Sequence, residues 1–446
     1  MRKLTLLICT IFSVILLAQT ASAITFNPNF DIYSEAAYLV NLDTGEVVYQ
    51  KNADKRLVPA SLTKIMCAVV LIDAYKGNIG DLSTTYVSGN SQCFDELYMT
   101  GCSNADIRIG EKVSYIDLLY ALMLRSACEA ANIIAYNVGG SLQGFADMMN
   151  QKAIEIGCKD THFTNAHGLF WENHYTTAED MAKITQYAMS LPLFTEISCA
   201  PSYTMEATAY HTEPRQINHT NFMLSKTLGG SQYYYEYAKG IKTGTLDEAG
   251  RCLVTLAYKD GYSYMLVTLN APQVDENGKT VYYNFLDHKN IYEWAFDSLK
   301  YTDILVDSEE IDEVKVAYGE GRDYVIVRPA KGYSSIWNRG IPLNSIHRVI
   351  TLEENVVAPV ENGQVMGKLE LMYNGKTLFE TELISTSGVE RSRQQEVISI
   401  AKSFLFSDAF WNAVVYSVIL IVVYTTLYIV VRVLISSKQR KKFNKK

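Results

Sequence analysis

The sequence predicts an α+β fold, an antiparallel sheet flanked by helices, followed by a small all-β domain and a C-terminal transmembrane helix. Strand-like segments lie at residues 36–50 and again at 240–270, and the stretch between them is mostly helical. Because short connections join neighbouring antiparallel strands, we expect one sheet that is assembled from both ends of this region. The later part of the chain alternates in short apolar stretches, which predicts strands only.

The helices and strands of the first region are predicted from the spacing of apolar residues and from the turn residues that separate them. An Asp-Thr-Gly turn between two apolar alternating runs predicts a hairpin. Pro59 precedes a helical pattern, and apolar residues at helical spacing continue through the middle of the region with a break around Ser126. The expected helices cover about 61–75, 115–135, 145–156, 178–190 and 284–299, and the expected strands 36–40, 47–50, 240–243, 252–258 and 264–270.

The two ends of the chain predict export and membrane attachment. Residues 1–23 have a basic start, an apolar run and an Ala-Ser-Ala end, which is typical of a signal peptide; an uncleaved anchor is the alternative. Residues 411–431 carry no charge and are long enough to cross a bilayer. The basic tail 432–446 favours the cytoplasmic side, so we expect a cell-membrane protein with a single span and its large body on the extracytoplasmic side.

These segments define the expected domains. Residues 24–300 form the α+β domain and 301–390 the all-β domain. Residues 391–410 connect it to the span and can form an amphipathic helix on the bilayer surface.

Charge and cysteine content exclude some functions. The chain has 40 basic and 48 acidic residues, and residues 1–23 and 411–446 hold basic residues but no acidic ones. The body between them is therefore strongly acidic, which argues against a nucleic-acid partner. Of the eight cysteines, Cys93 and Cys102 flank a short polar segment and can form a local disulfide in an oxidising exterior. No metal-binding spacing is present, and we predict neither a metal nor a cofactor.

Three short motifs carry the chemistry. Ser61 lies three residues before Lys64, which places both side chains on one helix face, and a serine of this kind needs a base. Ser126 is the first residue of Ser-Ala-Cys. Lys242 and Thr243 begin the only Lys-Thr-Gly of the chain, at the end of a predicted strand, where they can hold a carboxylate. Their order predicts an active-site serine enzyme of the kind that penicillin attacks.

Two other segments match parts of this pattern. Residues 399–402 also read Ser-x-x-Lys, but they lie in the membrane connector with no motif after them. Residues 88–90 read Ser-Gly-Asn, in a polar loop shortly after Ser61. We expect both to be incidental.

Four stretches make the chain similar to the D-alanyl-D-alanine carboxypeptidases, the low-molecular-mass penicillin-binding proteins. They are residues 59–64, 126–132, 165–169 and 240–244. The resemblance implies a β-lactamase/transpeptidase-like domain that removes the terminal D-alanine from peptidoglycan stem peptides ending in D-Ala-D-Ala, with β-lactams as covalent inhibitors. Residues 165–169 resemble a loop near the site, which we expect to be structural.

The resemblance also implies a role for each motif residue. Ser61 is the nucleophile, Lys64 accepts its proton, and Ser126 relays a proton toward the leaving group. Lys242 and Thr243 hold the substrate carboxylate, and Cys128 is a further substrate-binding residue. The N–H groups of Ser61 and Thr245 form the oxyanion hole.

Cys128 departs from the family pattern, because an asparagine is usual there. A thiol is shorter than an amide and hydrogen-bonds weakly, so one good contact is lost. Such a loss slows an enzyme by about tenfold to a hundredfold. The alternative is a weak or inactive cell-wall binding or scaffold protein of the same fold; a thiol nucleophile and a β-lactamase are further alternatives, the latter without a recognisable deacylating glutamate.

Overall fold

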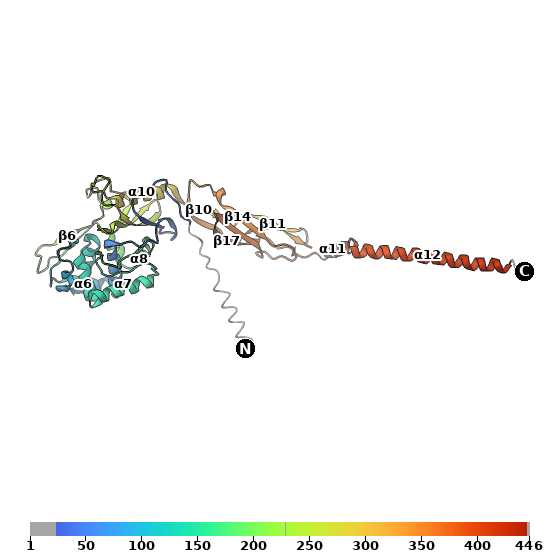
Figure 1. The fold of residues 1–446 in the computed structure, drawn as a ribbon, viewed down its shortest axis with the longest axis horizontal. Coiled ribbons are helices and arrows are strands. Elements are labelled where there is room, and N and C mark those ends of the chain that lie inside the picture. Colours follow the sequence, from blue (N-terminus) through green and yellow to red (C-terminus); the bar gives the residue numbers. More distant parts are fainter. Residues whose placement is uncertain (1–23, 228, 444–446) are drawn as a thin grey trace, which may run out of the picture. The chain divides into compact units, whose positions relative to one another are not determined.

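The protein is described by a computed structural model that covers residues 24–227 and 229–443 (Figure 1). The predicted signal peptide lies outside the described residues. The chain divides into two compact units. The first holds the residues up to Thr302 together with Ser335–Leu343, and the second holds Asp303–Ser334 and the chain from Asn344 onward. Each unit is described by itself.

A five-stranded antiparallel sheet forms the centre of the first unit, with the order β2-β1-β9-β8-β7. Its strands are β1 (Ala36–Asn41), β2 (Val47–Lys51), β7 (Ala238–Leu246), β8 (Gly250–Lys259) and β9 (Tyr262–Ala271). Strand β1 pairs with β9 in a register that sets Ala36 opposite Leu269. The sheet is therefore assembled from both ends of the region, as predicted, and β7 is an edge strand.

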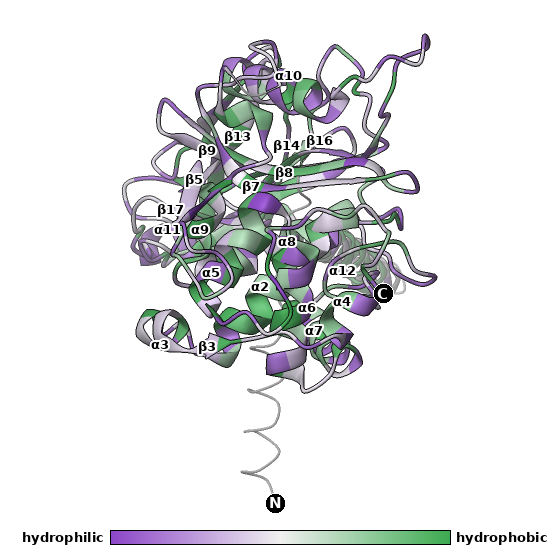
Figure 2. Cartoon of the chain, turned by 90° about the vertical axis from the view of Figure 1, so that its left-hand side faces the viewer, coloured by the Kyte–Doolittle hydropathy of each residue, from purple (hydrophilic) through white to green (hydrophobic). Residues whose placement is uncertain are grey.

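Helices cover both faces of this sheet (Figure 2). Helix α10 (Tyr283–Ser298) packs on β8 and β9 from one side, and α8 (Ala178–Ser190) packs on β9 and β1 from the other. The remaining helices of this unit are α2 (Thr63–Ala74), α3 (Ile79–Thr84), α4 (Gln92–Asp95), α5 (Tyr115–Tyr120), α6 (Cys128–Gly139), α7 (Leu142–Ile156) and α9 (Phe194–Cys199). Short strand pairs complete it: β3 (Tyr86–Val87) with β4 (Val113–Ser114), and β5 (Ser202–Met205) with β6 (Arg215–Asn218).

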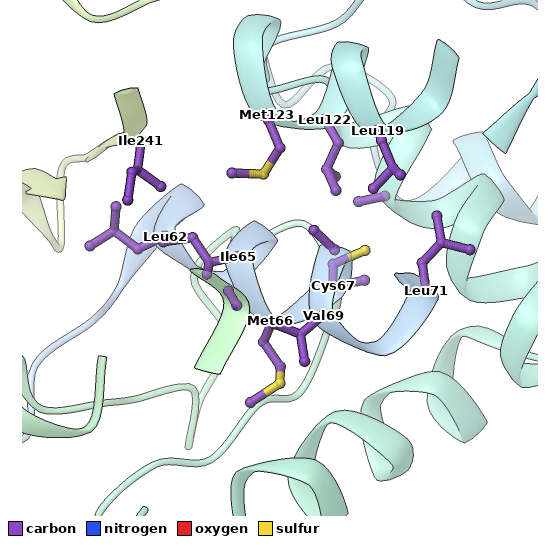
Figure 3. Close-up of a cluster of buried hydrophobic side chains, with 14 of the residues drawn as sticks. Leu62, Ile65, Met66, Cys67, Val69, Leu71, Leu119, Leu122, Met123 and Ile241 are labelled. Atoms are coloured by element: carbon purple, nitrogen blue, oxygen red, sulfur yellow. The ribbon is translucent and has the colours of Figure 1, made fainter. Parts of the chain in front are cut away.

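Helix α2 lies inside the core. Its residues from Thr63 to Ile72 are all buried, which is the pattern of a helix that is surrounded on every side. Figure 3 shows apolar side chains of α2 in one cluster with Leu119, Leu122, Met123 and Ile241. Cys67 is one of them, and it acts as a small buried apolar residue, as expected. The start of α2 is thereby held rigidly beside the edge strand.

The second unit contains a six-stranded sheet with the order β14-β16-β17-β12-β11-β15. Its strands are β11 (Asp312–Ala317), β12 (Tyr324–Pro329), β14 (His347–Leu352), β15 (Val356–Val357), β16 (Val365–Tyr373) and β17 (Lys376–Ser385). Strands β10 (Leu299–Leu305) and β13 (Tyr333–Asn338) form a separate pair, and the first unit holds most of β13 and the start of β10. The all-β character expected after Lys300 is confirmed.

Two helices follow this sheet. Helix α11 (Arg393–Leu405) exposes Val397, Ile400 and Phe404, and α12 (Asp408–Phe443) contains a candidate membrane span over Asp408–Lys438 with none of its most apolar stretch buried in protein. By length and composition this helix can cross a bilayer.

Candidate active site

The first motif lies at the entry to α2. A short 3₁₀ turn, η1 (Ala60–Leu62), carries the partly buried Ser61, and α2 begins directly after it. Lys64 is fully buried, and its Nζ donates a hydrogen bond of 3.0 Å to Ser61 Oγ. The same ammonium group donates to the His167 carbonyl oxygen and, at 3.5 Å, to Cys128 Sγ. A partly buried serine hydroxyl and a fully buried lysine amine are thus held in direct contact.

The loop at 165–169 shapes the wall around this pair. Gly168 has φ +82°, and a Cβ there would lie 2.1 Å from the Ala60 carbonyl oxygen. Only glycine fits so close to the η1 backbone. Asn165 closes the loop by accepting from the Gly168 N–H at 2.6 Å and donating to the Leu169 carbonyl at 3.0 Å. The loop therefore does more than the structural role expected from the sequence, because it presents the His167 carbonyl to Lys64.

A buried polar network fixes the His167 ring. The Leu169 N–H donates to His167 Nδ1 at 3.1 Å, so Nε2 carries the proton and donates to Glu96 at 3.0 Å. Asn132 also donates to Glu96, at 2.7 Å. Burial acts to raise the pKa of Glu96, but the hydrogen bonds from His167 and Asn132 outweigh it, so this pKa is lowered. Residues from α6 and from the turn after α4 thereby hold the loop that contacts Lys64.

The second motif lies where the helical run breaks, as predicted. A π-helical turn, η2 (Ala121–Arg125), ends at Ser126, which adopts a left-handed conformation with φ 64°. Helix α6 then begins at Cys128, whose N–H donates to the Ser103 carbonyl at 2.9 Å. Ser126 is almost fully buried, and the structure records no hydrogen bond of its hydroxyl to another described residue. The position of Ser126 is therefore set by its backbone.

Glu129 anchors the segment that lies against this motif. Its carboxylate accepts from the N–H groups of Ala105 at 2.6 Å and Ile107 at 3.4 Å. The second carboxylate oxygen is buried without a partner among the described residues. Burial raises the pKa of Glu129 to about 7, although the backbone hydrogen bonds act in the opposite direction. This carboxyl group therefore changes charge near neutral pH.

The third motif lies on the edge strand β7. Lys242 is fully buried, and burial together with the charge of Lys64 holds its pKa well below the usual range. Its Nζ donates to the Thr243 carbonyl at 3.0 Å, and the Thr243 hydroxyl shares a hydrogen bond of 2.6 Å with Thr220. A Cβ at Gly244 would lie 3.1 Å from the Cβ of Ala60, so the glycine lets β7 pack against η1.

The structure thus brings most of the predicted residues together. Lys64 contacts both Ser61 and Cys128, and Lys242 interacts electrostatically with Lys64 and Cys128. Thr245 follows on the same strand and is exposed. Ser126 lies between η2 and α6, both of which pack on α2, and no hydrogen bond between Ser126 and Ser61 is recorded among the described residues.

Several site residues were not found from the sequence. Thr220 and Glu96 lie in segments that no motif marks, so no local signal points to them. Glu129 lies in the stretch 126–132, but the sequence does not indicate its contacts with Ala105 and Ile107. The sequence allows a local disulfide between Cys93 and Cys102, but all seven described cysteines are free. Cys93 lies near Asn90, whereas the Cys102 thiol interacts with Cys128. That disulfide is not formed because the turn at 97–100 directs Cys102 toward the start of α6.

This arrangement defines a class of hydrolases that use a serine nucleophile with a lysine base. The sequence profile described as D-alanyl-D-alanine carboxypeptidase matches residues 20–273, and that of the penicillin-binding protein 5 C-terminal domain matches 300–391. The first match covers more than half of the chain. The chain belongs to the D-alanyl-D-alanine carboxypeptidase family.

Individual relatives support the same family assignment. D-alanyl-D-alanine carboxypeptidase DacF of Bacillus subtilis is 27% identical over 360 residues, which is 80% of this chain and 86% of that protein. A D-alanyl-D-alanine carboxypeptidase of a Streptomyces species is 32% identical over 253 residues, 55% of this chain and 82% of its own. The crystal structure of DacD from Francisella tularensis has a TM-score of 0.60 and 23% identity, over 84% of this chain and 98% of its own, and supports the fold.

Proposed function

We propose that this protein removes the terminal D-alanine from peptidoglycan stem peptides that end in D-Ala-D-Ala, through an acyl-enzyme on Ser61. The observation that carries the proposal is the 3.0 Å contact between Ser61 Oγ and the fully buried Lys64 amine, beside a second buried lysine. Family membership supports the same reaction.

Acylation starts when Ser61 Oγ attacks the carbonyl carbon between the two D-alanines. Lys64 in its neutral form takes the hydroxyl proton, so the attacking oxygen becomes a strong nucleophile. The N–H groups of Ser61 and Thr245 stabilise the negative oxygen of the tetrahedral intermediate. The C–N bond then breaks, and a proton relayed through Ser126 leaves with the amine of D-alanine.

Substrate selection rests on the cationic strand. Lys242 and Thr243 hold the terminal carboxylate, and burial of Lys242 strengthens this attraction because less water competes for the charge. A substrate carboxylate would also restore the charged form of Lys242, whose pKa is lowered in its absence. Water finally attacks the acyl-enzyme, with Lys64 as the base, and releases a stem peptide that is one residue shorter.

Cys128 is compatible with turnover. Its sulfur contacts Lys64 at 3.5 Å, so a polar partner remains where an amide is usual. Separate solved structures of a Streptomyces DD-transpeptidase carry alanine in place of a serine and of a cysteine two positions later, the spacing of Ser126 and Cys128. That enzyme is 28% identical, with a TM-score of 0.53 over 61% of this chain and all of its own. We therefore favour a slow enzyme over an inactive scaffold.

The cellular setting follows from the ends of the chain. We propose that residues 1–23 direct export, that 24–300 form the catalytic domain and that 301–390 form the β domain. Residues 391–410 connect to a single span at 411–431, and the basic tail 432–446 lies in the cytoplasm. The apolar helix α12 supports this arrangement. The catalytic body would then meet peptidoglycan on the extracytoplasmic side, where β-lactams also reach it.

Mass spectrometry after incubation with a D-Ala-D-Ala peptide tests the reaction. We expect the loss of one alanine, and no loss with Ser61→Ala. The matched variant Ser399→Ala changes the serine of the second Ser-x-x-Lys and should keep full activity. Persistent trimming by Ser61→Ala would refute the proposed nucleophile, and an untrimmed peptide with the native protein would favour the scaffold alternative.

A further inference from the structure

The side chains of Cys102 and Cys128 interact, and the Cys128 sulfur lies 3.5 Å from Lys64 Nζ. Cys102 is partly exposed, and Cys128 is buried at the start of α6. The neighbour of Cys102, Ser103, accepts the Cys128 N–H at 2.9 Å, which ties the two backbone segments together. Among the described residues, this is the one cysteine pair whose side chains interact. The remaining cysteines lie elsewhere in the fold.

We propose that Cys102 and Cys128 are a modification site that a small disulfide such as oxidised glutathione converts to an intramolecular disulfide, and that this bond slows the reaction at Ser61. The effect on the reaction rests on the proposed function, whereas formation of the bond does not. The predicted extracytoplasmic location of the domain is the kind of compartment in which disulfides form.

Local geometry favours bond formation. Cys102 lies in an irregular stretch outside any helix or strand. A disulfide needs the sulfur atoms to approach to about 2 Å, and the 2.9 Å backbone hydrogen bond between Cys128 and Ser103 keeps the two segments close together. The interaction with Cys128 lowers the pKa of Cys102 and raises that of Cys128, so the partly exposed Cys102 is the thiol that more readily becomes a thiolate.

Thiol–disulfide exchange forms the bond in two steps. The Cys102 thiolate attacks one sulfur of the small disulfide, forms a mixed disulfide and releases one small thiol. Cys128 then gives up its proton and attacks the Cys102 sulfur, which releases the second small thiol. The protein loses two thiol protons and two electrons, and the reagent takes up both.

The bond would change the surroundings of Lys64. Cys128 Sγ is one of three acceptors of the Lys64 ammonium, together with Ser61 Oγ and the His167 carbonyl. A disulfide draws this sulfur toward Cys102 and fixes the segment from Cys102 onward against α6. Lys64 loses a partner, and the position of Ser126, two residues before Cys128, is constrained.

Glutathione buffers of graded redox poise, applied to the full chain in detergent, test the proposal. Peptide mapping of the oxidised protein should show a Cys102–Cys128 link, and acylation of Ser61 by a fluorescent penicillin should slow by about tenfold and recover on reduction. Cys102→Ser should be insensitive to the buffer, and Cys158→Ser, another partly exposed cysteine, should respond like the native chain.

Each alternative result has a distinct meaning. A link between Cys93 and Cys102, or free thiols at every poise, would overturn the modification site. A complete Cys102–Cys128 link with an unchanged acylation rate would overturn its effect on the reaction. Absence of labelling in the fully reduced protein would count against the proposed function instead, because mapping of the link does not depend on labelling.

Discussion

The chain contains the sequence Ser-x-x-Lys twice, and the two copies differ in almost everything but spacing. At the start of α2, Lys64 is fully buried, contacts Ser61 and lies beside the edge strand β7. On α11, Lys402 is exposed, and the helix has no buried residue at all. In both copies helical spacing places the two side chains on one side. The difference shows that the motif only places a serine and a lysine next to each other. Reactivity also depends on segments from elsewhere in the chain that enclose the pair.

The largest test of this comparison removes the amine from each copy. Lys64→Gln should slow acylation by a fluorescent penicillin by roughly 10²- to 10⁴-fold, the usual contribution of a general base. Lys402→Gln should leave the rate unchanged. Stopped-flow labelling of both variants measures this. Equal effects on the two copies would mean that enclosure of Lys64 does not matter.

A second test disturbs the enclosure without touching a polar side chain. Gly168→Ala places a Cβ against the Ala60 carbonyl, so we expect a loss of about 2–4 kcal/mol of stability and slower acylation. Gly45 also has a positive φ, but nothing lies within 4 Å of its Cβ position. Gly45→Ala should cost about 1 kcal/mol and spare the acylation rate. Urea unfolding compares the two; a Gly168→Ala protein as stable as Gly45→Ala would contradict the close contact.

A third test concerns the carboxylate behind Cys128. The folded state raises the pKa of Glu129 from 4.5 to about 7, so between these values the folded protein holds this proton more tightly than the unfolded chain. The free energy of unfolding therefore falls by up to about 3 kcal/mol as pH rises from about 4.5 to 7, and the stability that this proton contributes at low pH is lost. Buried His174 and His219 have pKa values lowered to about 3 and about 4, so they raise the free energy of unfolding as pH rises toward the usual histidine pKa.

The difference between the native protein and Glu129→Gln isolates this term, because both proteins keep the two histidines. Unfolding free energies measured across this pH range should give a difference that falls as pH rises and then stays constant. A difference that does not change with pH would mean that Glu129 has the same proton affinity in both states.

The smallest expected effect comes from restoring the usual amide at position 128. Cys128→Asn should raise the acylation rate by about tenfold, because an amide offers Lys64 a better acceptor than a thiol. Labelling kinetics under reducing conditions, where no disulfide can form, give this value. A slower Cys128→Asn enzyme would show that the thiol suits this particular site.

The sheet, the central helices and the later β region could be predicted because each has a local signal. The alternating strands at both ends of the first region and the apolar run of α2 are examples. The break at Ser126 was also visible in the pattern. The π-helical turn before it was not, because its residues Ala121–Arg125 have ordinary helical composition.

Only those residues of the site that belong to a sequence motif could be predicted. Ser61, Lys64 and Lys242 were found because residue type and order specify the chemistry. Thr220 and Glu96 were missed because each becomes a neighbour of the motifs only when distant segments pack together. The disulfide between Cys93 and Cys102 that the sequence allows is not formed, since proximity in sequence says little about which thiols meet in the fold.

Strand β7 has one further consequence. It pairs with β8 alone, so the backbone groups along its outer side are not used by the sheet. An extended peptide could align there and be read through its main chain, as in strand addition to a sheet edge. The enzyme would then tolerate different side chains earlier in the stem, and discrimination would fall on the last two residues. One scaffold could in this way serve cell walls whose cross-linking residues differ.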